Sequence, residues 1–271
     1  MSQSAIPTEV RRIDVGDAEL HVEITGEGPD VLLVAGLGGR GAFWANQIQP
    51  FAQTHRVITF DHRGCGKSTR GKTVDSVAHM ASDVCALMDA LGIASVGLVG
   101  HSTGGAIGQH IALDTPERLD KLVLSCSWPG PDAYFLELFR MRREVLEGAG
   151  PLNYLSSGTF LAMPSRHLQP QIEGAKSYME GRLAAFPGVE VELSRIAAVV
   201  GHDLRDHLSD ILIPTFCIGA LDDQITPAGF TQEMADLIPG AQISLLDHGG
   251  HFSPMSVPQE YNERVFEFLQ S

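Results

Sequence analysis

The sequence is poor in the features that mark secreted, membrane-bound and nucleic-acid-binding proteins. It has four cysteines in 271 residues and no C-x-x-C pair, which argues against a disulfide framework or a cysteine zinc site. No apolar run is long enough to cross a bilayer, and the start, MSQSAIPTEVRR, has no hydrophobic signal core. Basic residues number 19 against 33 acidic residues, a formal net charge of -14, which repels phosphate backbones and anionic lipid. We therefore expect a cytoplasmic protein that binds neither nucleic acid nor membrane.

Short apolar segments alternate with helical segments along most of the chain. Helical spacing of apolar residues over 75–91 and in the last segment, 256–270, indicates amphipathic helices. The first two apolar segments flank a glycine turn at 16–18 and are typical of an antiparallel pair. The later alternation predicts an α/β fold with a mostly parallel central sheet flanked by helices. The predicted strands are 10–15, 19–25, 30–36, 56–61, 95–100, 121–127, 213–219 and 242–247.

The stretch 128–212 interrupts this alternation. It contains helical segments such as 133–150 but no convincing strand. We interpret it as a helical cap or lid insertion over the C-terminal ends of the strands, where parallel sheets place their ligands. The core then consists of residues 1–127 and 213–271.

One serine lies among five glycines and a histidine in VGLVGHSTGGAIG, residues 96–108. Gly100 to Gly104 read G-x-S-x-G around Ser102, between a predicted strand and a glycine- and alanine-rich helix. That context is typical of a nucleophile elbow, a turn so sharp that its neighbours must be small. The alternative is an ordinary strand-to-helix turn with a capping serine.

A second glycine motif, GLGGRG at 36–41, permits two interpretations. It fits the dinucleotide-binding pattern G-x-G-x-x-G, and Asp61 at the end of the next strand could bind a ribose. However, a predicted hairpin precedes this strand, and the same glycines would let a backbone amide turn toward a reacting oxygen. The first interpretation predicts NAD binding, whereas the second needs no cofactor.

A serine nucleophile needs a general base, and the base needs an orienting acid. After a nucleophile elbow, the acid and then the histidine follow in the chain. The segment IGALDDQITP, residues 218–227, offers Asp222 and Asp223, and LLDHGGHFSP, residues 245–254, offers His248 and His251. The residue types therefore occur in the expected order, each after a predicted strand.

These motifs, with DHRGCGKS at 61–68, resemble those of the α/β-hydrolase-fold family from about residue 19 to the C-terminus. The resemblance implies a Ser-His-Asp triad of Ser102, His251 and Asp223, because this acid precedes Pro227 by four residues and this histidine follows a glycine. It leaves His248 as a hydrogen-bonded neighbour and Asp222 as a turn residue.

The resemblance also implies an oxyanion hole made by the backbone N–H groups of Thr103 and Leu37. Relatives have His-Gly before the second donor, where this chain has Ala35-Gly36. The substitution removes a side chain that supports the loop but removes no donor. No metal or organic cofactor is implied.

Within the family, the segments LLVAGLGGRGAFW and DHRGCGKS are most similar to aminoacrylate hydrolases and 3-oxoadipate enol-lactonases. This similarity implies a serine hydrolase that cleaves an ester, lactone, amide or enamine-type bond in a small carboxylate-bearing metabolite. The fold also hosts C–C bond hydrolases, non-hydrolytic enzymes and small-molecule receptors, and these alternatives stay open. A homodimer also stays open.

The planar guanidinium group of arginine can bind both oxygens of a carboxylate. Arginines near the predicted site are therefore candidate substrate contacts. Arg40 lies in the predicted oxyanion loop, and Arg140, Arg142 and Arg143 cluster in the insertion, of which Arg140 and Arg143 are the candidates. Trp128 is a candidate pocket wall. The alternative is that the insertion arginines pair on a helix surface with acidic neighbours three or four residues away, namely Glu137, Glu144 or Glu147.

Overall fold

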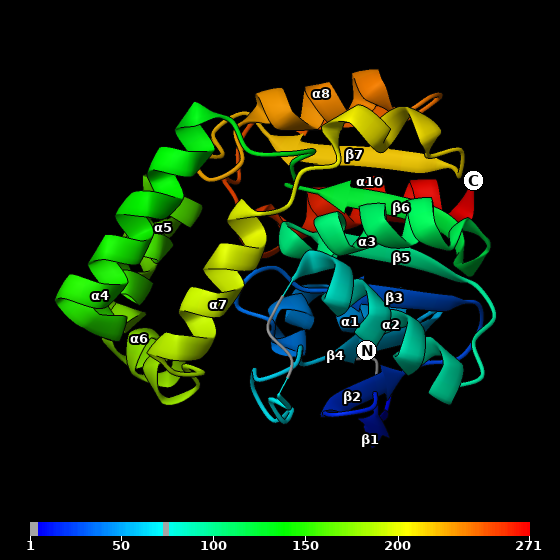
Figure 1. The fold of residues 1–271 in the computed structure, drawn as a ribbon, viewed down its shortest axis with the longest axis horizontal. Coiled ribbons are helices and arrows are strands. Elements are labelled where there is room, and N and C mark those ends of the chain that lie inside the picture. Colours follow the sequence, from blue (N-terminus) through cyan, green and yellow to red (C-terminus); the bar gives the residue numbers. More distant parts are fainter. Residues whose placement is uncertain (1–4, 73–75) are drawn as a thin grey trace.

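A computed structural model of the chain describes residues 5–72 and 76–271. One sheet has the strand order β1-β2-β4-β3-β5-β6-β7-β8 (Figure 1). All pairings from β4 to β8 are parallel, whereas β2 is antiparallel to both β1 and β4. The predicted mostly parallel sheet with an antiparallel start is confirmed. The strands are β1 Thr8–Asp14, β2 Glu19–Thr25, β3 Asp30–Val34, β4 Arg56–Phe60, β5 Val96–His101, β6 Leu119–Ser125, β7 Thr215–Ala220 and β8 Gln242–Leu246.

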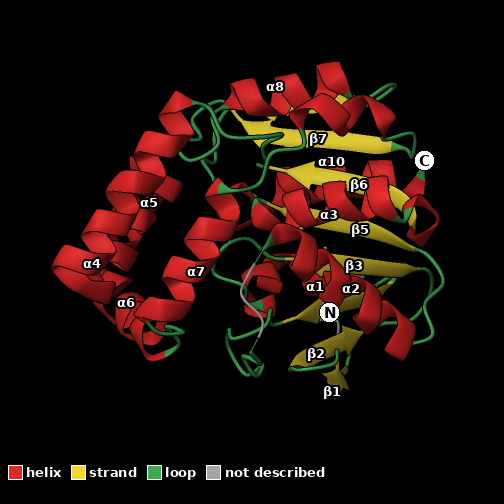
Figure 2. Ribbon diagram, in the orientation of Figure 1, coloured by secondary structure: helices red, strands yellow, loops and turns green. Residues whose placement is uncertain are grey.

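Helices cover both faces of the sheet (Figure 2). Side chains alternate along β3, so that Leu32 and Val34 join one buried cluster while Val31 and Leu33 join the other. The first cluster includes side chains of α2, α3 and α8, and the second includes those of α1 and α10. These helices are α1 Ala45–Phe51, α2 Val77–Ala90, α3 Thr103–Asp114, α8 Ala228–Leu237 and α10 Pro258–Gln270, with a short α9 at Ser253–Ser256.

The predicted α2 begins close to its expected position. Ser76 caps it by accepting a hydrogen bond from the His79 N–H at 3.1 Å. The expected first residue, Asp75, lies outside the described residues.

Within the described part of the chain, no helix combines the length and apolar character needed to span a membrane.

Four helices lie between β6 and β7 and stand beside the sheet (Figure 1). We call them the inserted helices: α4 Ala133–Ala162, α5 Ser165–Leu168, α6 Ala175–Ala184 and α7 Val189–Val200. The helix predicted over 133–150 ends in a kink, where Gly150 has φ 82° before Pro151, because proline disfavours helical backbone at the residue before it. The chain then resumes a helix to Ala162. Short 3₁₀ turns complete the chain: η1 Gly41–Trp44, η2 Pro116–Arg118, η3 Gln169–Gly174 and η4 Arg205–Asp210.

Buried histidines make the fold sensitive to acid. His202 is 3% exposed, and its Nε2 lies 3.2 Å from Gln109 Oε1. Burial lowers the pKa of His202 from 6.5 to about 3. The folded state therefore binds this proton more weakly than the unfolded chain does. The contribution of His202 to stability is full above about pH 6.5 and is lost as the pH falls toward 3, by about 1.4 kcal/mol per pH unit.

We expect the His202→Gln variant to lose less stability than the native chain between pH 6.5 and pH 5, since glutamine has no proton to bind. Urea unfolding at several pH values measures the slope. His207→Gln, at an exposed position, is the matched control and should keep the native slope. An unchanged slope in His202→Gln would contradict the assignment.

Candidate active site

Ser102 occupies a strained turn between β5 and α3. Its backbone has φ 53° and ψ -116°, a conformation that costs energy for a residue with a side chain. The Ser102 N–H donates to the Ser125 carbonyl at 2.8 Å, which ties the turn to the end of β6. A Cβ on Gly104 would collide with the Val34 carbonyl oxygen, so only glycine allows α3 to approach β3 this closely. The turn thus has the geometry expected of a nucleophile elbow.

Asp223 and His251 form a buried pair after β7 and β8. His251 Nδ1 lies 2.9 Å from Asp223 Oδ2, and the side chains are 5% and 0% exposed. The other carboxylate oxygen, Oδ1, accepts from the backbone N–H groups of Ile225 (2.8 Å) and Thr226 (3.0 Å). An ionised carboxylate only accepts, so His251 Nδ1 carries the proton in this pair. Its Nε2 then remains an acceptor, as a general base requires.

Thr226 joins this pair, and the motifs did not single it out. Its hydroxyl lies 2.9 Å from Asp223 Oδ2, 3.1 Å from His251 Nδ1 and 2.9 Å from the Cys126 carbonyl. Asp222, the other candidate acid, accepts from the Gly250 N–H at 2.8 Å and so holds the loop before His251. The two neighbouring aspartates therefore have different contacts: one holds the histidine ring and the other holds its loop.

Cys126, Asp223 and His251 place potential metal-ligand atoms within 4.8 Å of one another, the one such group among the residues described. Metal binding requires the thiolate. Burial, followed by the charge of Asp223, raises the pKa of Cys126 well above its ordinary value. The donor set therefore favours a hydrogen-bonded acid–histidine pair over a metal centre.

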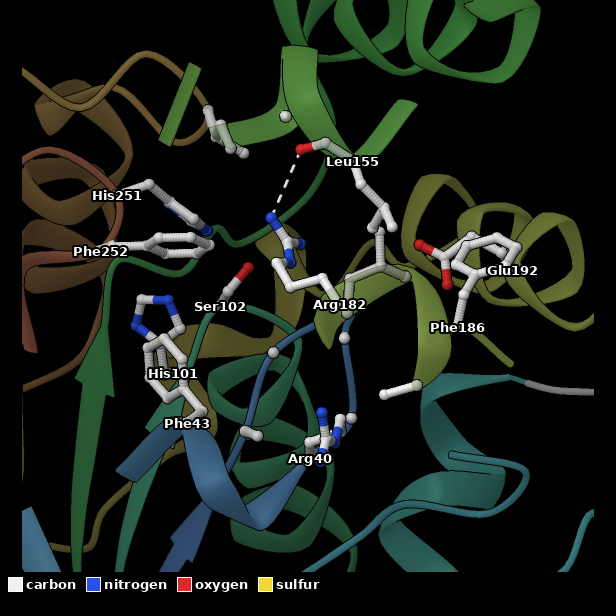
Figure 3. Close-up of a pocket in the computed structure, with 18 of the residues that line it drawn as sticks. Arg40, Phe43, His101, Ser102, Leu155, Arg182, Phe186, Glu192, His251 and Phe252 are labelled. Atoms are coloured by element: carbon white, nitrogen blue, oxygen red, sulfur yellow. Dashed lines mark hydrogen bonds between the residues drawn. The ribbon is translucent and has the colours of Figure 1, made fainter. Parts of the chain in front are cut away.

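A cavity of about 330 Å³ opens over Ser102 and His251 (Figure 3). Phe43 and Phe252 form part of its wall, and the His101 ring stacks on Phe43 at 4.6 Å. His101 also lies 4.9 Å from the His251 ring. Burial and the neighbouring His251 hold the pKa of His101 well below 6.5, so His101 is a neutral wall residue.

Two segments that carry the predicted oxyanion donors lie next to Ser102: the start of α3 and the loop after β3. Thr103 begins α3, where first-turn N–H groups have no intrahelical acceptor. In the loop after β3, the Gly39 N–H donates to the Gly36 carbonyl at 2.9 Å. Because this peptide is trans, the Leu37 N–H points away from that carbonyl. A Cβ on Gly36 would lie 3.1 Å from Ser102 Cβ, so the predicted donor loop passes beside the serine.

The nucleotide-binding interpretation of GLGGRG requires Asp61 to be available to a ribose. Asp61 is 6% exposed. Its Oδ1 accepts from the Gly41 N–H at 3.0 Å, and its Oδ2 accepts from the Lys67 N–H at 2.9 Å. Both oxygens therefore hold loops together, and neither is positioned as a free acceptor for a ribose.

The structure separates the candidate substrate contacts. Arg40 lines the cavity. Arg140 instead pairs with Glu137 at 2.6 Å and with Glu144. Arg143 pairs with Glu147 at 3.3 Å. Both are exposed surface arginines, as the alternative interpretation stated. Trp128 is buried and stacks on Phe135 at 5.0 Å, so it is placed in the core and not among the residues that line the cavity.

Arg142 and Arg182 line the cavity in place of Arg140 and Arg143. Arg182 donates to Thr159 Oγ1 at 2.6 Å and to the Leu155 carbonyl at 3.4 Å, and Figure 3 shows it in the cavity with Ser102. Arg142 donates to the Tyr154 hydroxyl at 2.8 Å. Burial lowers the pKa of Arg182, so the site destabilises this cation unless an anion joins it.

Glu192 is the acidic residue of the cavity lining. It is 5% exposed and accepts from the Tyr154 hydroxyl at 2.6 Å. Burial raises its pKa, while Tyr154 and the nearby arginines oppose that change. Among the residues described, no carboxylate forms an ion pair with Arg142 or Arg182. The lining includes Arg40, Arg142 and Arg182 against Glu192, so arginines outnumber carboxylates in the cavity of a protein of net charge -14.

The strained serine, the buried histidine–aspartate pair and the loop beside the serine supply the residue types that a serine-nucleophile site requires. The parallel sheet places this site at the C-terminal ends of its strands. The profile of the alpha/beta hydrolase fold family matches residues 29–257, and the chain belongs to that family.

Curated relatives and solved structures agree with this membership. A protein of Caulobacter vibrioides named "Putative carbamate hydrolase RutD" is 37% identical over 268 residues, which cover 96% of this chain and 99% of that protein. A thermophilic esterase from Thermogutta terrifontis, solved with malate bound, is 26% identical with a TM-score of 0.83, over 97% of this chain and 98% of that one. The enol-lactonase from Burkholderia xenovorans LB400 shares the fold, with 24% identity and a TM-score of 0.87, over 96% and 100% of the two chains.

Proposed function

We propose that the protein is a serine hydrolase that cleaves an ester, lactone, amide or enamine-type bond in a small carboxylate-bearing metabolite. The observation that carries the proposal is the strained Ser102 in one cavity with His251, whose Nδ1 is held by Asp223 at 2.9 Å. Relatives named for carbamate hydrolysis and for esterase activity support the bond class.

The proposed reaction has two steps. His251 Nε2 takes the proton of Ser102 as its oxygen attacks the substrate carbonyl, and the Leu37 and Thr103 N–H groups stabilise the oxyanion. The leaving group departs with the proton from His251, which leaves an acyl-enzyme. A water molecule, deprotonated by the same histidine, then releases the acid product and restores the serine. Asp223 stabilises the imidazolium in both steps.

The substrate charge is proposed from the cavity arginines. A substrate carboxylate would give Arg182 or Arg142 the direct ion-pair partner that no described carboxylate provides, and it would accept both N–H groups of a guanidinium fork. We further propose that the inserted helices act as a lid, because they supply these arginines.

A cytoplasmic location and a homodimer stay proposals. No two of the described cysteines form a disulfide, which supports the first.

Substitution Arg182→Met is expected to lower kcat/KM for a carboxylate-terminated ester about 10- to 100-fold, since hydrogen bonds to charged groups contribute about 1.5–3 kcal/mol. A methyl-terminated ester of equal length should change little. Arg140→Met, at an exposed ion pair, is the control and should leave both rates unchanged. An equal loss for both esters in Arg182→Met would remove the carboxylate assignment.

A further inference from the structure

Residues 35–40, between β3 and the 3₁₀ turn η1, form the loop that carries Leu37, and we call it the Leu37 loop. Three hydrogen bonds from different segments hold it. Within the loop, Gly39 donates to Gly36. From the segment after β4, the His62 N–H donates to the Gly39 carbonyl at 2.7 Å. The third contact comes from the inserted helices: Arg195 Nε donates to the Leu37 carbonyl at 2.9 Å. A residue 158 positions away in sequence thus fixes the loop that carries a predicted oxyanion donor.

Arg195 is a buried cation that makes no described ion pair with a carboxylate. It is 0% exposed and lies on α7. Its Nη2 donates to His62 Nδ1 at 3.1 Å. Burial and the charge of Arg195 hold the pKa of His62 well below 6.5, so this ring is neutral and can accept. A buried guanidinium is costly unless its contacts are well made. Here Nε holds the Leu37 carbonyl and Nη2 holds the His62 ring, while Nη1 has no hydrogen-bond partner among the described residues.

We propose that Arg195 is a positioning residue for the oxyanion hole. It fixes the peptide after Leu37, while the Gly39-to-Gly36 hydrogen bond fixes the peptide before it. Together these contacts determine the direction of the Leu37 N–H. This inference rests on the proposed serine mechanism, since it assigns a role to the loop only if an oxyanion forms.

The local sequence explains why the loop needs such a contact. Residues 35 and 36 are alanine and glycine, which offer no polar side chain to support the turn. Arg195 supplies the support from the inserted helices. The donor is therefore correctly oriented only when α7 is packed against the loop, which couples the transition-state geometry to the position of these helices.

The experiment compares native protein with Arg195→Met and Arg195→Lys, each normalised to active sites by end-point titration with a fluorophosphonate. In Arg195→Met, kcat per active site for a small activated ester should fall about 10- to 100-fold, the scale of a misplacement near 1 Å. The KM should change little. The affinity for an alkyl boronic acid, which mimics the tetrahedral intermediate, should fall by the same factor as kcat/KM. Arg195→Lys should recover part of both losses.

The matched control is Arg205→Met. Arg205 also joins distant segments, with Nη2 donating to the Gly130 carbonyl at 2.8 Å and Nε paired with Glu233 at 2.6 Å. It should lose stability but keep native kcat per titrated site. If Arg195→Met behaves in the same way, Arg195 is merely structural and the proposal is overturned. If native protein neither titrates nor turns over, the proposed serine mechanism itself is wrong.

Discussion

Replacing Ser102 with alanine is expected to lower kcat for any hydrolysed substrate about a million-fold, the scale at which a serine nucleophile acts in concert with its base. The oxygen that forms the acyl-enzyme is absent in this variant, and the cavity offers no equivalent hydroxyl on the strained turn. Steady-state kinetics on an activated ester measures the loss. Alanine keeps the Cβ and the same backbone strain at φ 53°, so thermal unfolding should change little.

The loss of kcat in a double variant shows whether Ser102 and His251 act as one unit or contribute separately. His251→Ala should cost about as much as Ser102→Ala, and the double variant should be no slower than either. Ser82→Ala, an exposed serine on α2, is the control and should retain native rates. Losses that multiply in the double variant would contradict a single nucleophile–base unit.

Replacing Asp223 with asparagine is expected to lower kcat about 10,000-fold through the wrong histidine tautomer. The backbone N–H groups of Ile225 and Thr226 require an oxygen at the Oδ1 position. The amide nitrogen must then take the Oδ2 position and donate to His251 Nδ1. This places the ring proton on Nε2, where it faces the serine and cannot accept a proton. A pH–rate profile and kcat together measure the loss.

The neighbouring aspartate provides the matched control for this variant. Asp222→Asn keeps an oxygen for the Gly250 N–H and does not contact His251, so its rate should remain within a few-fold of native. A larger loss in Asp222→Asn than in Asp223→Asn would show that the acid has been misassigned.

The sheet and the triad candidates were predictable because their signals are local. The central parallel strands β3 to β7 are short apolar runs, and each candidate follows a strand within a turn motif, as Ser102 follows β5 and His251 follows β8. Parallel strands bring these ends to one edge of the sheet. Assigning each strand from its local sequence is therefore enough to predict that these residues, far apart in the chain, lie at one site.

The cavity arginines could be predicted only in part. Arg142 shares a helical stripe with buried Phe135, Phe139 and Leu146, so a 3.6-residue period could have separated it from exposed Arg140 and Arg143. Arg182 gives no such signal, because α6 carries few buried residues and its orientation depends on packing against α4.

Thr226 and Arg195 make contacts that only the folded chain shows. Thr226 precedes a proline in a turn, and nothing in that context indicates a contact with His251. Arg195 lies on the buried face of α7, where an arginine contradicts the apolar pattern of its neighbours Ile196 and Val199. A charged residue on a buried helix face is the one local indication that it has a polar partner across the interface.

Covalent labelling tests the central claim most directly. Native protein, Ser102→Ala and His251→Ala would each be incubated with a fluorophosphonate and examined by intact mass and peptide mapping. The account predicts a single adduct on Ser102 in the native chain, none in Ser102→Ala and a greatly slowed reaction in His251→Ala. A native chain that stays folded and unlabelled, or that is labelled at another residue, would contradict it.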